Sequence, residues 1–166
     1  MKLKENLVTK NINWVGSIEI GGEEKERILK KAEQIIKKWK LKMPCLFSPL
    51  VLDFGYNDFK NTGHIEFIIA NEIKEGYCGK FIFMFKGQRC PEHYHKIKHE
   101  TFFVLKGKVL MEFDGEKIVL NPGDVLPMDR NKLHTFKALE NSLIIEVSQP
   151  SMKNDNFFSD SKIGVI

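Results

Sequence analysis

The sequence predicts a mainly-β protein, a sandwich or barrel with one amphipathic helix ahead of it. Two observations predict this class. From about residue 63, the 166-residue chain consists of short runs rich in β-branched and aromatic residues, separated by turn residues. Before them, the stretch 23–42 repeats apolar residues at three- and four-residue steps, which is the period of a helix with one buried face.

The predicted helix carries its apolar stripe on Ile28, Leu29, Ala32, Ile35, Ile36 and Trp39. Its lysines are interleaved with glutamates and fall on the opposite, solvated face. The next segment, residues 42–52, contains two prolines and is predicted to be a connector or an irregular edge. We therefore expect residues 1–50 to form a helical extension that packs on a barrel of residues 51–166.

The predicted strands are short and closely spaced, as in a sandwich or barrel. Asp114-Gly115 separates two of them and favours a tight hairpin, because both residues tolerate positive φ. The sequence NPGD at 121–124 predicts another turn. The runs are HIEFIIA, GKFIFMFK, TFFVLKG, KVLMEFDG, EKIVL, LHTFKAL and SLIIEVS.

Composition and charge exclude several classes of protein. With 42% hydrophobic and 29% charged residues, the chain is ordinary globular material and is predicted to form one domain. Three cysteines without CxxC spacing argue against a disulfide framework. The net charge of +4 is concentrated on one helix without a recognition motif, so we expect no nucleic-acid binding. The first 16 residues lack an apolar run, and no run approaches a membrane span, so we expect a cytoplasmic protein.

Titratable residues crowd into one short stretch that follows the apolar run FIFMF. Three of the five histidines, His93, His95 and His99, lie there beside Glu100. Such residues either decorate the surface of a β-hairpin or surround a metal ion. Further residues around the stretch distinguish these two interpretations.

The stretch resembles the two-part signature of the cupin superfamily. Gly87 and Gly107 bracket the HxH pair and the glutamate, and Pro122-Gly123-Asp124 with Pro127 precedes a further histidine. This resemblance implies a double-stranded β-helix, or jelly-roll barrel, that binds a divalent metal ion in its interior. The ligands that it implies are His93, His95, Glu100 and His134.

The spacing agrees with this ligand set. Residues two apart on a strand face the same side, so His93 and His95 can both point inward while Tyr94 points outward. A hairpin would then bring Glu100 to the same place, with Phe102 filling the barrel beside it. Three imidazoles and one carboxylate leave coordination positions open, as in a catalytic metal site. His99 has the wrong parity and is left out.

Longer phrases resemble the cupin-type D-lyxose isomerases, over about residues 50–163. They are LDFGYNDF, YCGKFIFMFKGQRCPEHYH, KHETFFVLKGKV and IIEVSQPSMKNDNFFSDSKI. The resemblance implies a manganese-dependent aldose–ketose isomerase, with Lys98, Glu146 and Asp160 at family positions. This chain departs from the family in its shorter connections between the ligands and in Lys162, which replaces an arginine. These departures suggest a different sugar or a sugar derivative.

Aldose–ketose isomerisation through an enediolate needs a Lewis acid, a base and a hydrogen-bond donor. On the resemblance, Glu146 would move the proton and Lys98 would donate to the sugar oxygens, while Asp160 and Lys162 would assist substrate binding. Each residue has a structural alternative. Glu146 could face solvent, Lys98 could be a surface lysine, and Asp160 and Lys162 could tie down the tail through a salt bridge. Cys90 is interpreted as a small buried hydrophobe.

Two other functions stay open at this point. The same ligand set loaded with Fe²⁺ supports dioxygenases, and a cupin can also hold a sugar or a metal without turnover. We expect Mn²⁺, with Zn²⁺, Fe²⁺, Ni²⁺ and Co²⁺ as alternatives. The expected partners are a small-molecule sugar and a second copy of the chain in a homodimer, with no membrane. The apolar run FIFMF suggests that a subunit covers one sheet face, and a buried inter-sheet core is the rival explanation.

Overall fold

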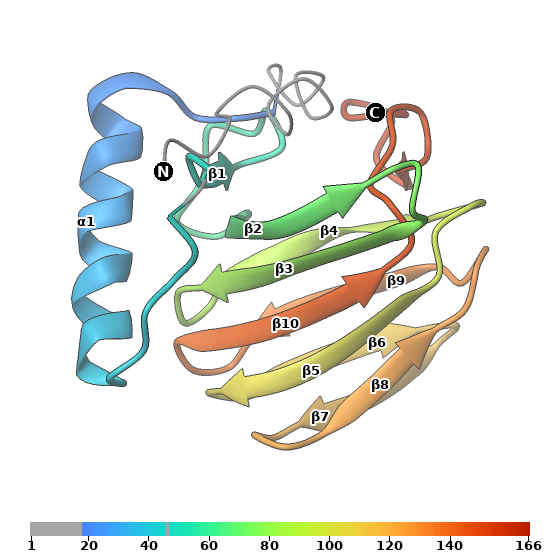
Figure 1. Cartoon of the computed structure of the whole chain (residues 1–166). Helices are drawn as coiled ribbons and strands as arrows, with labels where there is room; N and C mark the ends of the chain where they lie inside the picture. The colour runs from blue at the N-terminus through green and yellow to red at the C-terminus, as the bar shows by residue number, and fades with distance from the viewer. Residues whose placement is uncertain (1–17, 46) are drawn as a thin grey trace.

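Two antiparallel sheets face each other, and one helix covers part of the outside of one sheet (Figure 1). The computed structural model describes residues 18–45 and 47–166. The interpretation of the first 16 residues therefore lies outside the described part of the chain. The elements are α1 (Gly22–Lys38), β1 (Leu50–Leu52), β2 (His64–Glu72), β3 (Tyr77–Met84), β4 (Arg89–Tyr94), β5 (Glu100–Lys106), β6 (Val109–Phe113), β7 (Glu116–Leu120), β8 (Val125–Met128), β9 (His134–Ala138), β10 (Ser142–Ser148) and β11 (Phe157–Phe158).

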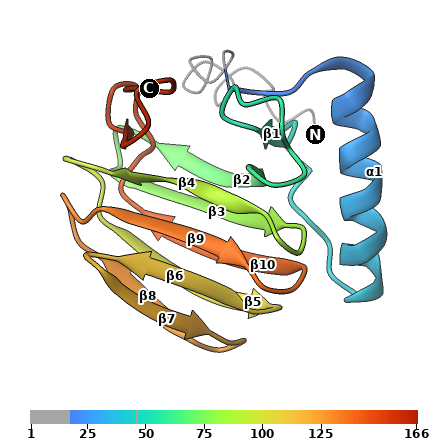
Figure 2. The same cartoon turned by 180° about the vertical axis from the view of Figure 1, so that it is seen from behind.

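From β3 onward the chain crosses repeatedly between the sheets, as in a jelly roll, with β6 and β7 paired in one sheet. The six-stranded sheet has the order β1-β2-β3-β10-β5-β8, and the five-stranded sheet has the order β11-β4-β9-β6-β7. Seen from behind in Figure 2, the five-stranded sheet lies in front of the six-stranded one. The mainly-β jelly-roll barrel predicted from the sequence, with one helix ahead of it, is confirmed.

Alternation along the strands divides the apolar residues between two cores. On β3, Ile82 and Met84 face the space between the sheets, whereas Phe83 packs outward against the helix. The ring of Trp39 lies 5.9 Å from that of Phe83, centroid to centroid. The run FIFMF is therefore covered on both faces within the chain. Its outer face at Phe83 is covered by α1, so it is not the exposed surface that a second subunit would need.

Helix α1 packs its buried residues Ile28, Ala32 and Ile36 on this outer face. It ends at Lys38, four residues before the end of the predicted segment. The reason is local: Lys40 adopts φ +58°, and the N–H groups of Lys40 and Leu41 turn back to the carbonyls of Lys37 and Ile36. Within the two described ranges, no helix has the length and hydropathy to cross a bilayer.

The predicted turns are confirmed. Asp114 and Gly115, with φ of +47° and +83°, join β6 to β7, and Gly123 at φ +100° lies in the turn before β8. Gly107, at φ +77°, has a second reason to be glycine. A Cβ there would lie 2.3 Å from the carbonyl oxygen of Asn141, so this bracketing glycine serves close packing.

Candidate metal centre and active site

Both sheets contribute to a buried cluster of His93, His95, Glu100 and His134. Their ligand atoms all lie within 4.8 Å of one another, and each residue is at most 7% exposed. His93 and His134 are register partners on β4 and β9, whereas Glu100 opens β5 in the opposite sheet. The expected hairpin between β4 and β5 is therefore wrong, because the loop between them crosses from one sheet to the other.

The histidine rings are oriented by main-chain carbonyls. Nδ1 of His93 lies 2.8 Å from the oxygen of Pro91, Nδ1 of His95 lies 2.7 Å from that of Asp155, and Nδ1 of His134 lies 2.8 Å from that of Lys132. A carbonyl oxygen only accepts, so each Nδ1 carries the hydrogen. In the neutral ring, Nε2 then keeps a lone pair that can bind a metal ion, and metal-binding histidines commonly use this tautomer.

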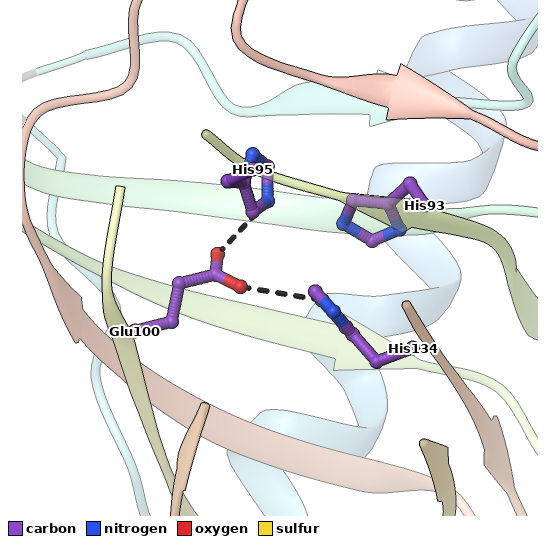
Figure 3. Close-up of side chains that lie close together, drawn as sticks. All are labelled: His93, His95, Glu100 and His134. Carbon is purple, nitrogen blue, oxygen red and sulfur yellow. Dashed lines mark ion pairs between the residues drawn. The ribbon is translucent and has the colours of Figure 1, made fainter. Parts of the chain in front are cut away.

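The remaining polar atoms of the cluster fit a divalent cation. Among the residues that the structure describes, Nε2 of His95, Nε2 of His134 and Oε2 of Glu100 are buried without a hydrogen-bond partner. Glu100 lies between the two rings, with 3.4 Å from its Oε1 to His95 and 3.3 Å from its Oε2 to His134 (Figure 3). Buried polar atoms rarely stay without a hydrogen-bond partner. Two imidazole nitrogen atoms and one carboxylate oxygen that converge in this way are suitable ligands for a metal ion.

Electrostatics keeps His93 and Glu100 in the state that binds metal. Burial, followed by the neighbouring rings of His134 and His95, lowers the pKa of His93 well below its usual 6.5. Burial opposes ionisation of Glu100, but Lys98 and then His95 outweigh it and hold its pKa well below the usual 4.5. At neutral pH the site therefore presents a neutral imidazole at His93 and a carboxylate at Glu100. His99 lies outside the cluster, 3.3 Å from Asp129.

Lys98 and Glu146 lie in the same interior, beside the cluster. Lys98 is 4% exposed, with its Nζ 2.6 Å from Oε1 of Glu100 and 3.3 Å from Oε1 of Glu146. Glu146 on β10 is 2% exposed and also accepts a hydrogen bond from Ser148 at 3.0 Å. Both residues line one cavity with His93 and Glu100. The solvent-facing alternatives for Lys98 and Glu146 are therefore wrong.

Sequence reasoning missed three further charged or titratable residues in this cavity. Lys80 lies between Glu146 and Glu66, at 3.1 Å and 2.8 Å, and His64 lies 3.2 Å from Glu66. A signal for them existed in the strand parity. His64 and Glu66 share a face of β2 with Ile68, and Lys80 shares a face of β3 with Ile82, so polar residues occupy inward positions.

Asp160 and Lys162 are placed differently. Asp160 accepts a short hydrogen bond from the hydroxyl of Tyr56 and another from the backbone N–H of Lys162, at 2.9 Å. The Lys162 side chain is exposed. The structure therefore does not bring these two residues to the cluster. Cys90 is buried, which raises the pKa of its thiol well above the usual 9.0 and agrees with a structural role.

Comparisons with known proteins place the chain in a family. A sequence model described as the cupin domain matches residues 81–147. The D-lyxose/D-mannose isomerase of Thermosediminibacter oceani is 34% identical over 141 residues, which cover 68% of this chain and 77% of that protein. The chain belongs to the cupin-type D-lyxose isomerases. The expectation of a sugar isomerase is confirmed at the level of this family.

The chain also resembles one solved structure and one further sequence relative. The crystal structure of Geodermatophilus obscurus L-ribose isomerase superposes with a TM-score of 0.73, covering 88% of this chain and 95% of that one. At 18% identity, this likeness shows the fold alone. The quercetin 2,3-dioxygenase of Bacillus subtilis is 37% identical over 94 residues, but the match covers 54% of this chain and 27% of the dioxygenase.

Proposed function

We propose that the protein is a metal-dependent aldose–ketose isomerase of pentoses or hexoses, with D-lyxose as the first candidate. The observation that carries the proposal is the cluster of His93, His95, Glu100 and His134 in the same interior as Glu146 and Lys98. Relatives named D-lyxose isomerase support the choice of sugar.

His93, His95, Glu100 and His134 would hold the metal ion, for which we propose Mn²⁺. When bound, a divalent ion supplies Lewis acidity that polarises the oxygens at C1 and C2 of the open-chain sugar. Zn²⁺, Fe²⁺, Ni²⁺ and Co²⁺ are alternatives, because three imidazoles and one carboxylate suit each of them.

Glu146 would remove the proton from C2 and return it to C1 after the enediolate forms. Its carboxylate is surrounded by donors, since Lys98, Lys80 and Ser148 all lie within 3.3 Å. These contacts fix the orientation of the carboxylate, which proton transfer requires. Lys98 would donate to the sugar oxygen on which negative charge develops.

A neutral sugar fits the charge balance of the cavity better than a sugar phosphate. Lys80 is paired with Glu66 and Glu146, and Lys98 with Glu146 and Glu100. No arginine occurs among the described residues that line the cavity. A phosphate group would therefore meet carboxylates without an unpaired lysine or arginine side chain, among the described lining residues, to bind it. The role of Asp160 and Lys162 in substrate binding stays a prediction.

The quercetin dioxygenase match supports one alternative, an Fe²⁺-dependent dioxygenase built on the same ligands. The short coverage of that enzyme makes it the second candidate. A cupin that binds a sugar or a metal without turnover is the third candidate. These three functions differ in their need for oxygen and in whether a product forms.

We also propose a homodimer and a cytoplasmic location. Four apolar side chains are 45–58% exposed on the six-stranded sheet: Ile69, Tyr77, Val125 and Val147. Val147 pairs with Gly79 and Thr101 on the neighbouring strands, and Val125 with Phe103. An apolar sheet face of this kind is typical of a surface that pairs with its own copy.

The test of function is a turnover assay on protein with known metal content. Purified protein is analysed for metals, stripped, reloaded with Mn²⁺ and assayed anaerobically with D-lyxose, D-mannose and other pentoses and hexoses. We expect the matching ketose to form only when metal is present. Oxygen consumption with quercetin would favour the dioxygenase, and saturable sugar binding without a product would favour the binding protein.

A further inference from the structure

His64 lies in the cavity but has no role in the proposed chemistry. It opens β2, is 4% exposed and lines the same cavity as Glu146 and Lys98. Two aromatic rings flank it, with centroids of Phe54 and Phe136 at 5.3 Å and 6.1 Å. Because its ring is held on both sides, its two nitrogen atoms have fixed surroundings.

One ring nitrogen of His64 is satisfied and the other is not. Nε2 lies 3.2 Å from Oε1 of Glu66, an oxygen that also accepts from Lys80 at 2.8 Å. Burial opposes ionisation of Glu66, but Lys80 and then His64 outweigh it and lower its pKa, so the carboxylate only accepts. Nε2 therefore carries a hydrogen. Nδ1 is buried and has no hydrogen-bond partner within the described residues.

An unpaired buried nitrogen in a binding cavity points to a ligand. In the neutral ring Nδ1 accepts a hydrogen bond, and in the charged ring it donates one. A hydroxyl group can both donate and accept, so it satisfies Nδ1 in either state. Sugars offer several hydroxyl groups, and a site that hydrogen-bonds a hydroxyl discriminates strongly against the analogue that lacks it.

The position of His64 in the cavity indicates which hydroxyl groups of a bound sugar would contact it. A chain of ion pairs leads away from the metal ligand Glu100 through Lys98, Glu146, Lys80 and Glu66, and it ends at His64. If C1 and C2 of the sugar lie beside the metal ligands and Glu146, the later carbons extend toward the far end of this chain. His64 then faces the hydroxyl groups beyond C3.

We propose that His64 is a specificity-determining residue, whose Nδ1 binds a hydroxyl at the end of the sugar remote from the metal. This inference rests on the proposed isomerase function. Glu66 acts on it as a positioning residue, because its carboxylate fixes the hydrogen on Nε2. The same subsite would account for selection among sugars that are identical at C1 and C2.

Two variants of His64 test the contributions of its two ring nitrogen atoms separately. His64→Gln can keep a donor to Glu66 while removing the atom at the Nδ1 position. His64→Asn places an amide atom near Nδ1 and gives up the contact with Glu66. The probes are D-lyxose, 4-deoxy-D-lyxose and 5-deoxy-D-lyxose. Melting temperature and metal content are measured for each variant, so that unfolded or metal-free protein is recognised.

We expect the unsubstituted protein to prefer D-lyxose over at least one deoxy analogue by about tenfold or more in kcat/KM. In His64→Gln this preference falls to within about twofold, with metal content unchanged, and in His64→Asn part of it remains. Equal discrimination by the unsubstituted protein and by His64→Gln would overturn the proposal.

A binding measurement separates this inference from the proposed function. In Zn²⁺-loaded protein with ¹⁵N-labelled histidines, D-lyxose should shift the Nδ1 resonance of His64, which is assigned by its absence in His64→Gln. A shift without turnover would support the subsite and refute the isomerase. The isomerase would stand and the subsite would be refuted if D-lyxose is turned over, the Nδ1 resonance does not shift, and His64→Gln keeps the preference for D-lyxose over its deoxy analogues. The absence of both would refute both.

Discussion

The main-chain carbonyl of Asp155 accepts a hydrogen bond from Nδ1 of His95, at 2.7 Å, across 60 positions of the chain. The carboxylate of Asp155 also accepts from the backbone N–H groups of Lys96, Ile97 and Lys98, at 2.9–3.0 Å. A single residue of the C-terminal tail thus fixes the ring of a candidate ligand and the loop that carries Lys98.

Asp155→Ala should weaken metal binding without removing a ligand. The variant loses the acceptor for three loop N–H groups while keeping the carbonyl that orients His95. We expect about a tenfold loss in metal affinity, the lower end of what supporting residues around a metal contribute. Competition with a chelator measures it. Asp155→Asn keeps one acceptor oxygen, so its metal affinity should fall between those of Asp155→Ala and the unsubstituted protein. Unchanged affinity in both variants would contradict the positioning role.

His95→Ala and Glu100→Ala should each abolish stoichiometric metal binding. Each variant removes one of the four donors whose atoms converge within 4.8 Å. His99→Ala is the matched control, because this histidine lies in the same loop but is 3.3 Å from Asp129 and outside the cluster. Elemental analysis after dialysis measures the bound metal. A full equivalent retained by both ligand variants would sink the assignment.

Glu146→Gln should lower kcat by about 10²–10⁴-fold, the usual contribution of general acid–base catalysis. The amide keeps the size of the side chain but cannot take the proton from C2. Metal content should not change, since Glu146 is outside the ligand set. Glu140→Gln, an exposed substitution in the turn before β10, is the control. Full turnover by Glu146→Gln on the true sugar would show that another group moves the proton.

Glu66→Gln should destabilise the metal-free protein in a pH-dependent way. The folded-state pKa of Glu66 lies below its usual 4.5, because Lys80 and His64 together outweigh the opposing effect of burial. A lowered carboxyl pKa contributes stability above the unfolded value, which is lost as the pH falls toward and through the folded value. We expect Glu66→Gln to cost about 3–5 kcal/mol at pH 7, as for a broken buried ion pair.

Urea unfolding at pH 7 and below pH 4.5 measures the difference between Glu66→Gln and the unsubstituted protein. The difference in the free energy of unfolding should shrink at the lower pH, because the stabilisation from ionised Glu66 is lost as the pH falls. Glu116→Gln, on the exposed strand β7, should change little at either pH. A difference that grows on acidification would have the wrong sign for a lowered pKa.

Val147→Lys should convert the proposed dimer into a monomer. Val147 is 58% exposed on β10, a central strand of the six-stranded sheet, so a charge there would be buried in a sheet-to-sheet interface. Light scattering coupled to size-exclusion chromatography measures the mass. Ile118→Lys, which is 43% exposed before substitution and lies on the other sheet, is the control. A monomeric unsubstituted protein would refute the dimer.

Local rules were sufficient for much of the fold. The period of residues 23–42 predicted the helix, and Asp114-Gly115 predicted the β6–β7 hairpin, because each depends on neighbours in sequence. The end of the helix was not predictable in this way. Lys40 adopts a left-handed conformation that lysine seldom favours, and no glycine marks the position.

The sequence by itself pointed to the candidate ligands, because its resemblance to the cupin signature, which depends only on order along the chain, implies His93, His95, Glu100 and His134. Only the tertiary structure decided which face of β10 carries Glu146 inward, and that Lys98 is buried between two carboxylates. It also decided that Asp155 supports His95 from the tail. The contacts of Lys98 with Glu146 and of His95 with Asp155 join positions 48 and 60 residues apart, and packing rather than local preference sets such distances.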